Sequence, residues 1–122
     1  MLDIYLVEDC DLIRDNLAST LVELLAARIV GSAGSESVAI AELTTKPDRW
    51  NLAIMDIFLK PGSGLNVLAR IQRRLPHQKV AVLTNYASQE VRRECLRIGA
   101  DVVFDKSTDI EALISYCESL NL

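Results

Sequence analysis

The chain has 122 residues, half of them hydrophobic and a quarter charged, with a formal net charge of −4 at pH 7. This length and composition are typical of a single compact domain, here residues 1–122, and they exclude a disordered chain. The acidic balance, with a pI of about 4.9, gives no sign of a domain that binds nucleic acid directly.

The cysteines and the apolar segments indicate a cytoplasmic protein. Cys10, Cys95 and Cys117 are odd in number, far apart and without a CxxC pair, so neither a disulfide framework nor a zinc site is expected. The opening residues, MLDIYLVEDCD, carry acids where a secretory signal carries bases, and no apolar stretch is long enough to cross a bilayer. We therefore expect a soluble cytoplasmic domain with no membrane contact.

Short apolar runs alternate with segments of helical periodicity from the start of the chain. The first run, residues 2–7, precedes a helix that Asp11 is placed to cap. The second run, residues 28–33, precedes a helix that Ser35 is placed to cap. The residues expected to mark these two helices are Ile13, Leu17, Leu21 and Leu24 or Leu25 on the first, and Val38, Ala41 and Glu42 on the second.

Three more apolar runs follow, at residues 52–55, 79–84 and 101–104. Pro76 is expected to end the third helix, and Ser88 and Gly99 to bound the fourth. Thr108 and Glu111 are spaced as a capping box for the fifth helix. The apolar positions at helical spacing are Leu65, Leu68, Ile71 and Leu75, then Val91, Cys95 and Ile98, then Ile110, Leu113, Ile114 and Cys117.

Continuously apolar strands that alternate with helices are typical of a parallel sheet covered by helices on both faces. Right-handed crossovers leave two main doubly wound arrangements, and five strands favour the order 2-1-3-4-5. We predict an α/β fold of this kind, a flavodoxin-like five-stranded sandwich.

Polar residues stand where four of the predicted strands end. Ligands bind at this edge of an open α/β sheet, because the carboxyl ends of parallel strands share it. Each residue alone has an ordinary explanation as a helix cap, a turn residue or a solvated lysine, but their joint occurrence in complementary types favours a site. The residues are Glu8 and Asp9 after the first strand, Asp56 after the third, Thr84 at the end of the fourth and Lys106 after the fifth.

Phosphoryl transfer to a carboxylate is the chemistry that uses such a set. Clustered carboxylates repel one another, and a hard cation such as Mg²⁺ offsets that repulsion while it keeps several waters. A lysine and a hydroxyl complete the contacts to phosphoryl oxygens, and an Asp carboxylate is an established phosphoryl acceptor.

The motifs that carry these residues resemble the receiver domain of bacterial two-component response regulators. They are LVED, IMDIFLKPGSGLNVL, VAVLT and GADVVFDKS, in the family's order and spacing, and the resemblance covers nearly the whole chain. It implies that Asp56 accepts a phosphoryl group from a sensor histidine kinase or a histidine phosphotransfer protein. It also implies a signalling switch rather than an enzyme, with only Mg²⁺-dependent self-phosphorylation and autodephosphorylation.

The resemblance also implies roles for the other site residues. Asp9 would bind Mg²⁺ directly, Glu8 through water, and Phe58 through its backbone carbonyl, together with Asp56. Lys106 would pair with Asp56 and then with the phosphoryl group. Thr84 would move to the phosphoryl oxygen and shift the surface of the fourth helix, fifth strand and fifth helix.

The sequence departs from the family pattern at several positions. The aromatic switch residue three before the lysine is Val103 here, and the aromatic follows at Phe104. Ser107 stands where the family commonly has a proline after a cis bond, Asn85 where it has a small residue, and the proline after Asp56 comes one position late, as Lys60-Pro61. These departures concern the switch details.

Two other functions are weighed against the phosphorylated receiver. A receiver-like module that acts without phosphorylation is one alternative, since Val103 and Asn85 depart from the pattern. An aspartyl-phosphate hydrolase of the haloacid-dehalogenase kind would need a second Asp where this chain has Phe58.

Charges near the end of the chain suggest a homodimer that forms on phosphorylation, through opposite charges on one face. They are Arg92, Arg93 and Arg97 on the fourth helix, and Asp101, Asp105, Asp109 and Glu111 on the fifth strand and helix.

Overall fold

The computed structural model describes residues 1–45 and 48–120, and its centre is one parallel sheet in the strand order β2-β1-β3-β4-β5. The predicted order and fold class are confirmed. Three apolar runs coincide with their strands, while β2 begins one residue earlier and β5 lies one residue later than expected. The strands are β1 (Leu2–Val7), β2 (Ala27–Ala33), β3 (Leu52–Met55), β4 (Lys79–Thr84) and β5 (Val102–Asp105).

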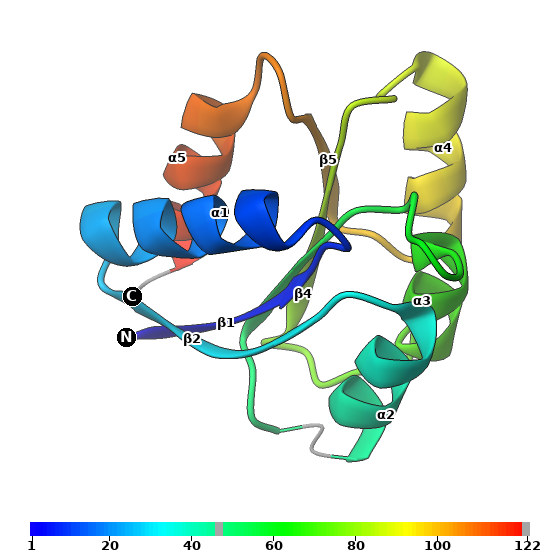
Figure 1. Ribbon diagram of the computed structural model, residues 1–122, viewed down its shortest axis with the longest axis horizontal. Helices are drawn as coiled ribbons and strands as arrows, with labels where there is room; N and C mark the ends of the chain where they lie inside the picture. Colours follow the sequence, from blue (N-terminus) through cyan, green and yellow to red (C-terminus); the bar gives the residue numbers. More distant parts are fainter. Residues whose placement is uncertain (46–47, 121–122) are drawn as a thin grey trace.

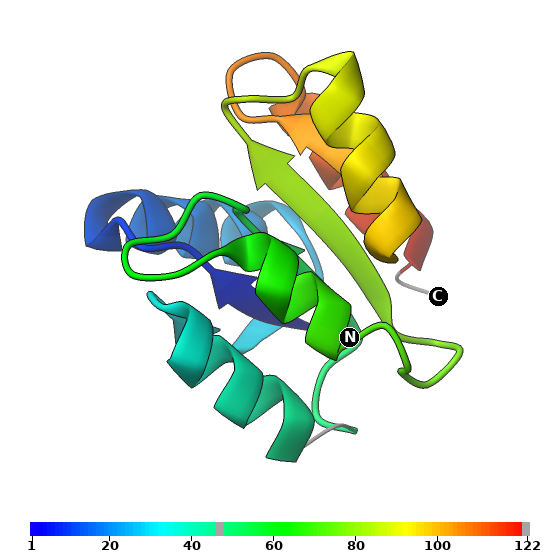
Figure 2. The ribbon, with the colours of Figure 1, turned by 90° about the vertical axis from the view of Figure 1, so that its right-hand side faces the viewer.

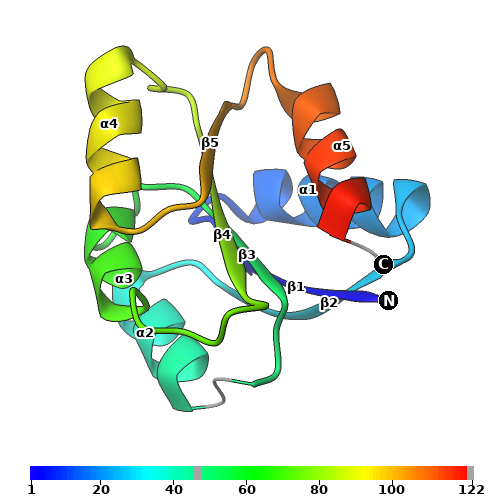
Figure 3. The same cartoon turned by 180° about the vertical axis from the view of Figure 1, so that it is seen from behind.

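Helices cover both faces of the sheet. Figures 1 and 3 show α1 and α5 on one side and α2, α3 and α4 on the other, and in Figure 2 the latter three lie in front of the strands. No helix in the described part of the chain is long and apolar enough to cross a membrane. The helices are α1 (Asp11–Leu24), α2 (Glu36–Thr45), α3 (Gly64–Arg70), α4 (Gln89–Ile98) and α5 (Ile110–Leu120).

The alternation of side chains along each strand divides the core in two. On β5, Val103 joins the cluster packed under α2, α3 and α4, whereas Phe104 joins the cluster under α1 and α5. On β3, Met55 and Ile54 divide in the same way. Both faces of the central strands are therefore buried, which explains why their sequences are apolar without a break.

The helix caps agree with the sequence at some positions and differ at others. Ser35 accepts the Val38 N–H at 3.4 Å and Ser88 accepts the Val91 N–H at 3.1 Å, as expected. Gly99 ends α4 with φ of +129°, which favours glycine. The predicted cap at Asp11 is wrong, because Cys10 is the N-cap residue and Asp11 lies in the first turn.

The predicted capping box of α5 is also absent from the structure. The helix begins at Ile110, one residue later than a Thr108 cap requires. Asp109 therefore occupies the boundary, and its carboxylate accepts the Asp105 N–H at 2.9 Å. The Thr108 hydroxyl contacts the Asp109 carboxylate at 3.4 Å.

The helix α3 is shorter than predicted, because it ends at Arg70 rather than next to Pro76. The Ile71 carbonyl accepts a hydrogen bond from the Arg74 side chain at 3.1 Å, in place of a further helical N–H. Leu75 consequently leaves the buried stripe and is 42% exposed.

The buried stripes of α1 and α2 also differ from the predicted ones. Ile13 and Val38 are exposed, whereas Leu21, Ala39 and Leu43 are buried. On α2 the small Ala39 faces the sheet, so the buried positions fall at 39 and 43 rather than at 38 and 41.

Candidate functional site

Backbone ladders bring the predicted site residues to one edge of the sheet. The Asp56 N–H donates to the Val7 carbonyl at 3.0 Å and thereby extends the pairing of β3 with β1. The Lys106 N–H donates to the Thr84 carbonyl at 3.0 Å and extends the pairing of β5 with β4. Because these bonds continue regular parallel ladders, the positions of both residues follow from the strand order.

Lys106 joins two of the predicted acids. Its Nζ donates to Asp56 Oδ2 at 2.7 Å and also to Glu8 Oε1. The three side chains are only 12%, 10% and 5% exposed, in the order Lys106, Asp56, Glu8. Burial lowers the pKa of the Lys106 ammonium, but hydrogen bonds and charge attraction from Asp56 and Glu8 outweigh burial, and that pKa lies above its ordinary value.

The second oxygen of each carboxylate is held by the backbone. Glu8 Oε2 accepts the Cys10 N–H at 3.1 Å, and Asp56 Oδ1 accepts the Phe58 N–H at 3.1 Å. Arg14 adds a guanidinium next to Glu8, because its Nη1 donates to the Glu8 carbonyl at 2.9 Å. The backbone thus holds the Glu8 and Asp56 carboxylates in place, and both pair with the single Lys106 ammonium.

Gly64 lets the turn after Asp56 pack closely on the Asp56 backbone. A Cβ on Gly64 would lie 2.2 Å from the Asp56 carbonyl oxygen and 2.5 Å from the Ile57 Cα. Ser63 caps α3 by accepting the Leu65 N–H at 3.1 Å. The start of α3 therefore packs directly on the backbone of Asp56, and only glycine fits at that contact.

Glu36, at the start of α2, fastens the same turn from outside. Its Oε1 accepts the Ser63 N–H at 2.9 Å and the Asn66 side-chain amide at 3.0 Å. The bond from Asn66, followed by the one from Ser63, holds the pKa of Glu36 below its ordinary value. No sequence pattern indicates this contact, because the partners of Glu36 are 27 and 30 residues away.

Asp9 and Thr84 lie at the same edge but outside the ion-paired contact. Asp9 is partly exposed, and the buried Thr84 hydroxyl accepts the Tyr86 N–H at 3.2 Å. Within residues 1–45 and 48–120, no three Asp, Glu, His or Cys side chains form a cluster that could hold a metal ion by themselves. The structure therefore joins Glu8, Asp56 and Lys106, and leaves Asp9 and Thr84 beside them.

Two exposed aromatic rings connect the loops after β3 and β4. Phe58 and Tyr86 meet edge to face with their ring centroids 4.7 Å apart. Asn85 lines a cavity of about 390 Å³ together with Lys106 and residues of α1. A cis peptide bond lies at Lys60–Pro61, and the bond after Lys106 is trans.

The position of the family's aromatic switch is filled by an aliphatic side chain. Val103 is buried under α4, while Phe104 faces the opposite side of the sheet and packs edge to face on Tyr116. Since neighbouring residues of a strand face opposite sides, Phe104 does not replace the missing aromatic.

Most of the charges expected at a dimer interface are paired within the chain. Arg92 pairs with Asp109, Arg97 with Glu94, and Arg74 with Asp101. These internal pairs leave fewer charges available for a partner than the sequence suggested.

Comparisons with known proteins agree on one family. A sequence profile described as Response regulator receiver domain matches residues 4–118. The DNA-binding transcriptional activator DevR/DosR of Mycobacterium tuberculosis is 30% identical over 101 residues, which are 82% of this chain and 45% of that protein. The response regulator VraR of Staphylococcus aureus is 29% identical over 103 residues, which are 84% of this chain and 48% of that protein.

Solved structures share the fold. A LuxR-family DNA-binding response regulator from Staphylococcus aureus superposes with a TM-score of 0.86 at 20% identity, over 100% of both chains. The CheX–CheY–BeF3–Mg²⁺ complex from Borrelia burgdorferi gives 0.87 at 16% identity, over 99% of this chain and 90% of that one. The chain spans less than half the length of the curated relatives that it matches.

Proposed function

The chain belongs to the response regulator receiver domain family of two-component signalling, and on that premise we propose that Asp56 is its phosphoacceptor. The donor is a phosphohistidine of a sensor histidine kinase or a histidine phosphotransfer protein. An Asp56 carboxylate oxygen forms a bond to phosphorus as the phosphorus–nitrogen bond breaks, and the electron pair stays on the imidazole. The observation that carries the proposal is the Asp56 carboxylate, fixed at the strand edge 2.7 Å from the Lys106 ammonium.

The neighbouring groups have separate tasks in this proposal. Lys106 offsets the negative charge of Asp56 and then binds a phosphoryl oxygen. The Phe58 N–H orients the carboxylate through Oδ1, so that the other oxygen faces Lys106. Thr84 supplies a hydroxyl that exchanges its bond from the Tyr86 N–H for a bond to the phosphoryl group.

Mg²⁺ is the cofactor that fits these donors. Two buried carboxylates share one ammonium, so the contact has an excess of negative charge and offers the hard oxygen atoms that Mg²⁺ prefers. In the proposal Asp9, Asp56 and the Phe58 carbonyl would hold the ion, and Glu8 would reach it through water. Bound there, it would screen the charge between the phosphoryl group and the carboxylate.

The consequence of phosphorylation is a change in the surface formed by α4, β5 and α5. Thr84 and Val103 are the switch residues in this proposal, and the changed surface acts on an effector or on a second copy of the domain. We place the protein in the cytoplasm, where histidine kinases present their phosphohistidine.

Phosphorylation with acetyl phosphate and Mg²⁺ tests the assignment. Intact mass spectrometry should find one added phosphoryl group that is stable in acid and labile in base, and Asp56→Asn should abolish it. Asp11→Asn, which changes an exposed acid in the first turn of α1, should leave it unchanged. Undiminished phosphorylation of Asp56→Asn would reject the assignment, and no phosphorylation of the wild type by any donor would favour a module that acts without it.

A further inference from the structure

Glu36, the first residue of α2, contacts three consecutive residues of the loop between β3 and α3. Its N–H donates to the Pro61 carbonyl at 3.3 Å, and its Oε1 accepts the Ser63 N–H at 2.9 Å. Between these two residues, a Cβ on Gly62 would lie only 2.4 Å from the Glu36 Cβ. The loop therefore lies directly on the start of α2.

The same loop folds back on itself next to Asp56. Ser63 pairs with Phe58 in an isolated antiparallel bridge. The Phe58 N–H in turn donates to Asp56 Oδ1 at 3.1 Å. A continuous set of contacts thus leads from the Glu36 carboxylate, through the backbone of Ser63 and Phe58, to the Asp56 carboxylate.

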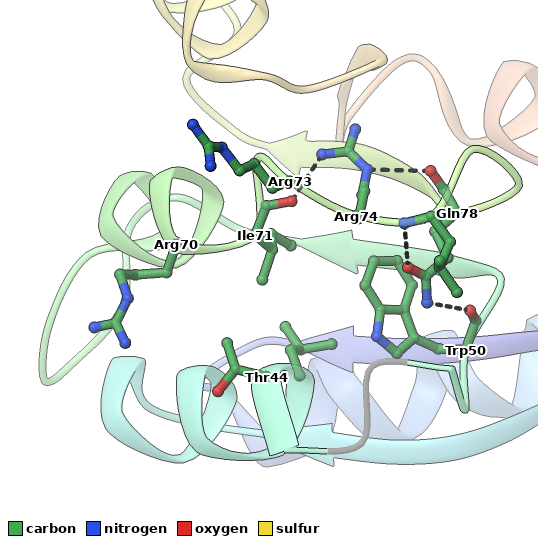
Figure 4. A pocket seen from close by; sticks show the side chains of 9 residues that line it. Thr44, Trp50, Arg70, Ile71, Arg73, Arg74 and Gln78 are labelled. Atoms are coloured by element: carbon green, nitrogen blue, oxygen red, sulfur yellow. Dashed lines mark hydrogen bonds between the residues drawn. The ribbon is translucent and has the colours of Figure 1, made fainter.

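The polar connection between α2 and this loop depends on Glu36. Within the residues that the structure describes, every hydrogen bond between α2 and residues 56–70 involves Glu36. At the other end of α2, Thr44 lines a cavity of about 410 Å³ together with Ile71, which follows α3, and Figure 4 shows these two side chains on opposite sides of it. The far end of α2 therefore does not take part in fastening the loop.

We propose that Glu36 is a positioning residue of the Asp56 site, which sets the affinity for Mg²⁺ by fixing the Phe58 backbone. This inference rests on the proposed function, in which Asp56 and the Phe58 carbonyl would hold the ion. Residues that hold metal ligands in place typically change metal affinity by about 10- to 100-fold when they are lost. Because Glu36 acts through a backbone bridge, we expect the lower end of that range, about tenfold.

Backbone amide NMR of nitrogen-15-labelled protein measures both steps of this proposal. In metal-free buffer, Glu36→Ala should speed hydrogen exchange at the Phe58 N–H several-fold, because the loop loses its hold on α2. In a titration with MgCl₂, the same signal should give a Kd about tenfold weaker than that of the wild type. A role confined to the helix dipole of α2 would lower the melting temperature and leave this Kd unchanged.

Two matched variants separate the hold on the loop from the charge of Glu36. Glu36→Gln keeps an acceptor oxygen for the Ser63 N–H, so its Kd for Mg²⁺ should stay within about threefold of the wild type. Glu111→Ala removes the exposed first-turn acid of α5 and should leave the Kd unchanged. The amide signals also report whether each variant is folded. If Glu36→Ala does not fold, Asn66→Ala replaces it, because it removes one donor to Glu36 at an exposed position and should weaken binding by about twofold.

Several results would overturn the inference. They are an unchanged Kd or an unchanged Phe58 exchange rate in Glu36→Ala, or in Asn66→Ala where that variant replaces it. A Kd for Glu36→Gln as weak as that of Glu36→Ala would also overturn it, since charge alone would then explain the loss. If the wild type itself shows no saturable shift with MgCl₂, the magnesium part of the proposed function fails together with this inference. Normal binding by the wild type with unchanged variants would overturn this inference alone.

Discussion

Replacing Lys106 by methionine should destabilise the protein strongly at neutral pH. The change leaves the Glu8 and Asp56 carboxylates facing each other with 5% and 10% exposed side chains. Removing one partner of a buried ion pair typically costs about 3–5 kcal/mol, because the remaining charge stays uncompensated. Cys10 and Phe58 still donate backbone N–H bonds to the two carboxylates, so we expect the lower end of that range, about 3 kcal/mol.

Urea unfolding followed by Trp50 fluorescence measures this loss, with Lys60→Met as the control because Lys60 is exposed. Mg²⁺ at about 10 mM should return more stability to the variant than to the wild type, because a bound cation takes the place of the ammonium. A loss below about 1 kcal/mol at pH 7.5 would refute the reasoning from the buried pair.

Three further predictions follow from contacts near the site and in the core. Gly64→Ala should lower the unfolding free energy by about 3 kcal/mol or more, because its Cβ would overlap the Asp56 carbonyl; a thermal melt in which it matches the wild type would contradict this. Ellman's reagent should react rapidly with one thiol per chain, the exposed Cys10, because Cys95 and Cys117 are buried and burial raises the pKa of Cys117 to about 11; Cys10→Ser should abolish the rapid phase. The folded-state pKa of Lys106 is raised, so the stability that Lys106 contributes should be fully present below the ordinary lysine value of about 10.4 and lost as pH rises through the higher folded value. The difference in unfolding free energy between wild type and Lys106→Met should therefore narrow above about pH 10.5. A difference that stays constant above that pH would argue against this prediction.

The strands were predictable because burial on both faces leaves a continuous apolar run in the sequence. The runs at 2–7, 52–55 and 79–84 match β1, β3 and β4 residue for residue. Helix ends that depend on a distant side chain were not predictable. The end of α3 is one example, since it is set by Arg74 rather than by Pro76.

The candidate site, like the fold, was predictable only in part from the sequence. The strand order alone places Asp56 and Lys106 at one edge, and the structure shows their predicted contact. It also shows a contact of Lys106 with Glu8 that was not predicted. The roles predicted for Asp9, Thr84 and Val103 stay predictions. Glu36 was missed because its contacts join segments that share no periodic pattern.

The contacts of Arg92 couple the movement of α4 to that of its neighbouring elements. This single guanidinium donates to the Ala87 and Val103 carbonyls and to the Asp109 carboxylate, so it ties α4 to β5 and to the residue before α5. A displacement of α4 would therefore strain the bonds to Val103 and Asp109 unless β5 and the residue before α5 moved with it. A partner bound to any one of these elements would then respond to a change in the other two.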